Sequence, residues 1–104
     1  MKILNKPELE EFAKLNPTAR TALERWTDLV SKIKGGDDKD SKDPKWLRFN
    51  DVLNTFNSAS YVKGHIIFNI KGKQFRMDTV ISFKLGVIKI VRIGTHKEYG
   101  NWKF

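Results

Sequence analysis

The stretch His65-Ile-Ile-Phe-Asn-Ile-Lys-Gly-Lys-Gln-Phe-Arg76 decides the fold, because it contains two β-rich runs separated by one short break. In the first run Ile66, Phe68 and Ile70 recur at every second position, as in a strand that buries one face. The break at Lys71-Gly72 is short enough for an antiparallel hairpin. The second half of the chain is therefore predicted to form a sheet.

Three β-rich runs are predicted, over residues 62–71, 73–84 and 87–94. In the middle run one face carries Phe75, Met77, Ile81 and Phe83, and the opposite face carries Gln74, Arg76, Asp78, Ser82 and Lys84. The third run follows a second break at Leu85-Gly86 and is less regular, because Ile88 and Ile90 share a face with Arg92. Met1 to Leu4 is a candidate for a fourth strand.

The first half is predicted to be helical. Asn5-Lys6-Pro7 and Asn16-Pro17 are typical of helix starts, because asparagine can cap free amides and proline is tolerated in the first turn. After these starts, apolar residues recur at helical spacing, at Leu9, Phe12 and Ala13 and then at Ala19, Ala22, Leu23, Trp26, Val30 and Ile33. Trp26 on this apolar stripe is predicted to lie in the core.

Between the helices and the sheet the pattern breaks. Gly35-Gly36 is predicted to end the second helix, and Asp37 to Asp43 to form an exposed polar loop. A helical turn is expected around Trp46 and Leu47, and a loop from Asn54 to Ser60. The fold class that follows is α+β, with two N-terminal helices packed on a small three- to four-stranded antiparallel sheet in one domain, residues 1–104.

Composition excludes several classes of protein. No apolar run approaches the roughly 18 residues that a membrane span needs. Glu8, Glu10 and Glu11 stand where a signal peptide would be apolar, which predicts a cytoplasmic protein. The absence of cysteine excludes disulfides, thiol nucleophiles and thiolate metal sites.

The net charge of +8 is confined to one half of the chain. Residues 1–44 hold nine basic and nine acidic side chains, whereas residues 45–104 hold eleven basic ones against only Asp51, Asp78 and Glu98. A field of one sign attracts nucleic acid or an anionic membrane. Nucleic acid is favoured, because the basic residues are interleaved along strands and not gathered on an amphipathic helix.

The candidates for chemistry lie where the last strand ends, in Thr95-His96-Lys97-Glu98-Tyr99. Attack by the 2′-hydroxyl of RNA needs a base, an acid for the leaving 5′-oxygen and cations for the charge on phosphorus. His96 is the candidate for proton transfer, because histidine is the residue type most often used for it, and Arg76 can hold phosphate oxygens with its planar fork. Tyr99 or Lys97 can move a proton, stack or pair with RNA. The candidates for RNA binding are Lys63, Asn69, Lys71, Lys73, Lys89 and Arg92.

Each candidate also has a structural explanation. Tyr99 and Trp102 can simply close the core, and the lysines can form a solvated face. His65 opens a strand without an evident companion, so a structural role is the better hypothesis for it.

No metal or other cofactor is expected. Three acidic residues spread over the second half are too few and too scattered for a metal nuclease, and no glycine-rich phosphate loop occurs. A Ser/His/Asp arrangement stays open, although no Gly-x-Ser-x-Gly motif supports it.

Two motifs carry a resemblance to a known family. Phe68-Asn-Ile-Lys-Gly-Lys-Gln-Phe-Arg-Met77, followed by a strand and Gly94-Thr-His-Lys-Glu-Tyr99, resembles the HigB-type toxins of bacterial toxin-antitoxin modules, within the RelE-like superfamily. The resemblance implies an mRNA interferase that cleaves transcripts, typically on the translating ribosome, and that is silenced by a helix-turn-helix antitoxin. The family motifs carry over to Asn69, Lys71, Arg76, His96, Glu98 and Tyr99.

The chain departs from the family pattern in three places. Members often have Asn at Lys73, often have Asp at Gly100, and often extend further beyond the motif. The leading hypothesis is a metal-independent endoribonuclease toxin that acts on mRNA and inhibits translation. The alternatives are a non-catalytic module that blocks translation by binding RNA or the ribosome, and a regulatory protein whose basic face only holds an acidic antitoxin segment.

Overall fold

A computed structural model describes residues 1–39 and 42–104, so the predicted loop from Asp37 to Asp43 lies partly outside the described residues. Within them, five strands form one sheet in the order β1-β5-β4-β3-β2. The strands are β1 (Lys2–Leu4), β2 (Ser60–Val62), β3 (His65–Ile70), β4 (Phe75–Ser82) and β5 (Val87–Thr95). All neighbours are antiparallel except β1, which runs parallel to β5. The α+β class and the strand at Met1 to Leu4 are confirmed.

The predicted run 62–71 is two strands and not one. Lys63 and Gly64 have φ angles of 47° and 87° and turn the chain between β2 and β3. Lys71 and Gly72, with φ angles of 53° and 64°, begin the longer turn of residues 71–74 between β3 and β4. Two successive residues with positive φ match the right-handed twist of a hairpin, and glycine adopts this conformation without steric cost.

The three helical segments before the sheet are α1 (Pro7–Leu15), the 3₁₀ helix η1 (Pro17–Ala19) and α2 (Arg20–Ser31). Both prolines lie in first turns as predicted. The predicted asparagine caps are wrong, because the Asn5 side chain donates to the Ile90 carbonyl and that of Asn16 to the Phe12 carbonyl. The asparagines therefore secure α1 against β5 and close its C-terminal end.

The segment after α2 also differs from the prediction. The helix ends at Ser31, before the two glycines, and Trp46 lies in extended chain beside Lys34. The helix α3 (Phe49–Thr55) starts later than expected and replaces the first part of the predicted loop. Its start is fixed by Asp51, whose carboxylate accepts hydrogen bonds from the backbone amides of the two residues that precede the helix, Leu47 and Arg48.

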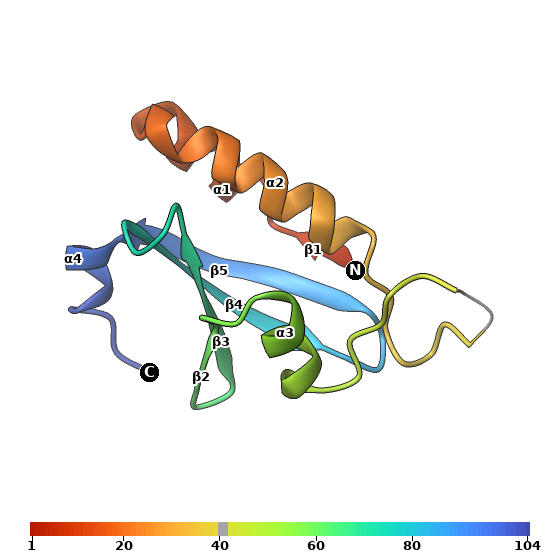
Figure 1. The fold of residues 1–104 in the computed structure, drawn as a ribbon. Coiled ribbons are helices and arrows are strands. Elements are labelled where there is room, and N and C mark those ends of the chain that lie inside the picture. The colour runs from red at the N-terminus through yellow and green to blue at the C-terminus, as the bar shows by residue number, and fades with distance from the viewer. Residues whose placement is uncertain (40–41) are drawn as a thin grey trace.

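The core lies between the sheet and the first two helices. Figure 1 shows α2 crossing one side of the sheet, while the chain after β5 turns to the other side. Phe68 in β3 is 1% exposed and packs edge-on against Trp26, which is buried as predicted. Trp46 and Phe56 contact the same ring at centroid distances of 6.4 and 5.3 Å. The face of the sheet turned away from these rings is free to carry polar side chains.

A β-bulge explains the irregular third run. Asp78 pairs with Arg92 and Thr79 with Ile90, so Val91 is an extra residue in β5. Before the extra residue the even-numbered side chains Ile88 and Ile90 face the core, and after it the odd-numbered Ile93 does. The bulge thereby turns Arg92 to the face opposite the core.

None of the described helices combines the length and the hydropathy that a bilayer span requires.

The contact between Gly35 and Gly86 gives a direct test of the fold. A Cβ atom on Gly35 would lie 2.4 Å from the backbone nitrogen of Gly86, where neither chain segment has a flexible end that can yield. We expect Gly35→Ala to destabilise the protein by about 1–3 kcal/mol in denaturant unfolding. Gly36→Ala is the matched control, because its nearest neighbour is 3.5 Å away. Equal stability of the two variants would contradict the close packing of this corner.

Candidate active site

The short helix α4 (His96–Tyr99) begins directly after Thr95, the last residue of β5. The Thr95 hydroxyl accepts a hydrogen bond from the Glu98 amide at 3.2 Å, and the Glu98 carboxylate accepts one from the Thr95 amide at 3.0 Å. This reciprocal capping box holds the start of the helix. Thr95 and Glu98 therefore have a structural role, and they present His96 and Lys97 to solvent.

The β3–β4 hairpin lies directly beside α4. The His96 amide donates to the Gln74 carbonyl at 3.0 Å, which ties the helix to the strand that follows the turn. Lys71 and Lys73 on this hairpin and Lys97 on the helix are exposed. The structure thus places exposed lysines on the hairpin and on α4, the two elements that meet at His96.

Arg76 lies beneath this cluster and is 8% exposed. Its Nη1 atom donates to the carbonyls of Lys73 and Phe75, at 2.7 and 3.3 Å, and its guanidinium lies 5.6 Å from the centre of the Tyr99 ring. The burial of Arg76 was not expected from its place among the polar residues of the middle run. Burial fixes this side chain between the hairpin and α4.

The sheet face below α4 holds a buried carboxylate, Asp78, whose burial the sequence did not predict. Asp78 is 0% exposed, with Oδ1 at 2.7 Å from Nδ1 of His65 and Oδ2 at 3.0 Å from Nε of Arg92. His65 therefore has a companion that the sequence did not make evident, and this pair agrees with the structural role expected for it. Alternation along β4 placed Asp78 on this face, but its partners depend on the strand register and on the bulge at Val91.

Arg92 joins this carboxylate to the end of the chain. Its guanidinium lies 4.7 Å from the Trp102 ring centre and 5.0 Å from that of Phe104, and Nη2 donates to the Lys103 carbonyl. Trp102 also covers Gly94, where a Cβ atom would lie 3.0 Å from the indole. Residues 100–104 are thereby held over the sheet face, and Trp102 packs on this face and not in the main core.

The structure brings only some of the predicted RNA-binding residues together. Asn69 pairs with Arg76 across β3 and β4, and its side-chain amide donates to the Ser58 carbonyl. Lys63 lies in the β2–β3 turn, where Nζ donates to the Phe104 carbonyl at 3.4 Å. Lys89 is exposed on β5 opposite Val80, toward the other end of the sheet. Residues of the hairpin and α4 therefore form the compact part of the candidate site.

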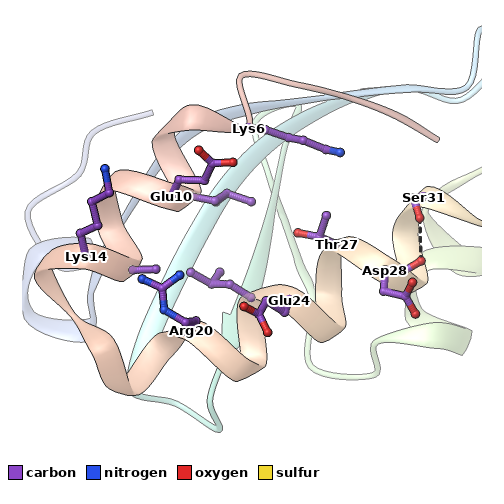
Figure 2. Close-up of a pocket in the computed structure, with 11 residues that line it drawn as sticks. Lys6, Glu10, Lys14, Arg20, Glu24, Thr27, Asp28 and Ser31 are labelled. Carbon is purple, nitrogen blue, oxygen red and sulfur yellow. Dashed lines mark hydrogen bonds between the residues drawn. The ribbon is translucent and has the colours of Figure 1, made fainter.

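Two other features of the structure do not form an active site. Within residues 1–39 and 42–104, no group of three or more His, Asp or Glu side chains is arranged to hold a metal ion. A groove of about 580 Å³ lies between α1 and α2 (Figure 2), and no residue of α4 lines it. Its rim alternates basic and acidic side chains, including Lys6, Glu10, Arg20 and Glu24, and it contains no histidine.

The fold and the site define a class of small basic α+β protein, with an exposed histidine beside a lysine-bearing hairpin. Residues 38–102, more than half of the chain, match the family model HigB_toxin, described as the RelE-like toxic component of a toxin-antitoxin system. The chain belongs to this family, and its helices and five-stranded sheet agree with the RelE-like fold. A search among curated proteins found no match to the sequence.

The Asp78 cluster makes a prediction for stability. Asp78→Asn should lower the free energy of unfolding by up to about 3 kcal/mol, the lower end of the range for breaking a buried pair, because 35% of the Arg92 side chain stays exposed. Asp28→Asn is the matched control, since its pair with Lys32 is exposed on both sides and should contribute under about 0.5 kcal/mol. Chemical denaturation measures both, and a loss no greater than that of the control would contradict the assigned role of Asp78.

Proposed function

We propose that this toxin is a metal-independent endoribonuclease that cleaves mRNA and so inhibits translation, with the translating ribosome as the place of action. The single observation that carries the proposal is the exposed His96 on α4, beside the hairpin that bears Lys71 and Lys73. This arrangement combines a proton-transfer group with cations for a phosphate. Membership in the toxin family supports the same reading.

The proposed chemistry is attack of a 2′-hydroxyl on the adjacent phosphorus. A general base takes the proton of the 2′-hydroxyl, whose oxygen forms the new bond to phosphorus. The bond from phosphorus to the 5′-oxygen breaks, a general acid gives that oxygen a proton, and a 2′,3′-cyclic phosphate forms. His96 is proposed to transfer a proton, while Lys97 and Tyr99 lie on the same helical turn and can assist. Arg76 is proposed to stabilise the charge on the phosphate oxygens, in a position fixed by its own hydrogen bonds.

The proposed RNA contacts follow the charge of the second half. Each of its three acidic side chains is used within the protein: Asp51 at α3, Asp78 beneath the chain end and Glu98 at α4. Lys63, Lys71, Lys73 and Lys89 are exposed and are proposed to contact the RNA backbone, with Asn69 and Arg92 at the sheet face. Asp78 is buried, and the other two acidic side chains are far outnumbered by the eleven basic ones, so the surface of this half is mainly positive.

One observation favours a second function. Gly100 stands where family members often have Asp, and it closes α4 by donating its amide to the His96 carbonyl. If that acid is required for proton transfer, the same basic surface would block translation by binding RNA or the ribosome without cleavage.

Membership in the toxin family implies a cognate antitoxin. We propose a helix-turn-helix antitoxin that covers the basic face, with the pair acting in the cytoplasm.

His96→Ala tests the chemical role. It should lower the rate of cleavage of translated mRNA by on the order of a hundredfold or more, because the proton-transfer group is lost, while RNA affinity stays nearly unchanged. Asn101→Ala is a control on an exposed side chain close to α4. Cleavage by His96→Ala at the wild-type rate would refute the site, and a wild-type protein that blocks translation without cleaving would support the second function.

Salt dependence tests the electrostatic part of the proposal. If even a few phosphates are neutralised by the lysines, affinity for RNA should fall by roughly tenfold or more between low and physiological salt, because condensed cations are released on binding. Titration of a labelled RNA at several salt concentrations gives the slope. A slope near zero would exclude binding through the charge of residues 45–104.

A further inference from the structure

Three aromatic side chains form a continuous row on the sheet face turned away from α1 and α2. The Tyr99 and Trp102 ring centres are 5.5 Å apart, and those of Tyr99 and Phe104 are 6.5 Å apart. Phe104 continues the row to His65 in β3, at 5.1 Å. The row therefore extends from the candidate active site across the sheet.

Buried or partly buried arginines hold this row in place. Arg76 lies against Tyr99, and Arg92 lies against both Trp102 and Phe104. The arginines are fixed in turn by backbone carbonyls and by Asp78. The rings are thus ordered before any ligand arrives, which lowers the entropic cost of binding.

The row differs from the aromatic residues of the core. Trp26, Trp46 and Phe68 are each 3% exposed or less, whereas all three rings of the row keep part of their surface in solvent. The exposed lysines around the row are Lys63, Lys97 and Lys103. Aromatic rings among cations fit one chemical class of ligand, a strand whose bases stack on rings and whose phosphates meet lysines.

We propose that Tyr99, Trp102 and Phe104 form a stacking surface for unpaired bases of single-stranded RNA, next to the phosphate that His96 would act on. This inference rests on the proposed function, since it takes RNA as the ligand. A duplex would bind less well, because its bases are already stacked and paired. The surface selects unpaired RNA, while the lysines alone bind any polyanion.

The test uses a fluorescent 2′-O-methyl RNA of ten nucleotides, which has no free 2′-hydroxyl and is not cleaved by the proposed reaction. The wild-type protein should bind it more tightly than a duplex of the same length. Trp102→Leu should weaken binding by about fivefold or more, and Trp102→Phe, which keeps a ring, should retain most of the affinity. Leu85→Ala removes an exposed apolar side chain in the β4–β5 turn and should change nothing.

Phe104→Leu shows whether weaker binding by Trp102→Leu comes from loss of the ring or from a general loss of structure. It removes a ring at the margin of the face, and it should also weaken single-strand binding with little change in melting temperature. Two results would overturn the inference and leave the proposed cleavage untouched. One is equal affinity of the wild-type protein for the single strand and the duplex. The other is that Trp102→Leu and Phe104→Leu both bind the single strand as tightly as Leu85→Ala does. Ring-dependent binding without cleavage of translated mRNA would support the inference and refute the proposed endoribonuclease.

Discussion

The carboxylate of Asp78 is the constraint on which the functional half of the molecule depends. It is fully buried between His65 and Arg92, and a buried charge of this kind is tolerated only when it is paired and hydrogen-bonded. Because its partners come from β3 and β5, this one side chain joins three strands. Arg92 then carries Trp102 and Phe104, which places the chain end over the sheet beside α4.

Arginine and lysine have different roles in the basic half. The two arginines of the sheet, Arg76 and Arg92, are engaged within the protein: Arg76 is buried and Arg92 partly buried, and both pack against aromatic rings and donate to carbonyls. The lysines of the hairpins and of α4 remain in solvent. A net charge of +8 therefore does not measure the charge available to a ligand, and the exposed lysines are the better guide to where RNA would contact the protein.

Much of the fold was predictable from the sequence because it depends on local periodicity. The apolar spacing from Ala19 to Ile33 identified the buried side of α2, and the Lys71-Gly72 break identified the β3–β4 hairpin. The bulge at Val91 was not predictable, because an extra residue in one strand is defined only against its partner. The ion pairs of Asp78 and the burial of Arg76 were not predictable for the same reason. They depend on how three strands are aligned and on where the C-terminal residues pack.

The candidate site was also predictable only in part. His96 and Lys97 follow from one short motif, whereas the rings and arginines beneath them are assembled from separate strands. Attack by the 2′-hydroxyl without a metal is tested most directly by the chemical ends of the RNA fragments. We expect the wild-type protein, acting on translated mRNA, to leave 2′,3′-cyclic phosphate or 3′-phosphate ends with 5′-hydroxyl partners. Fragments with 3′-hydroxyl and 5′-phosphate ends, or no fragments at all, would contradict it.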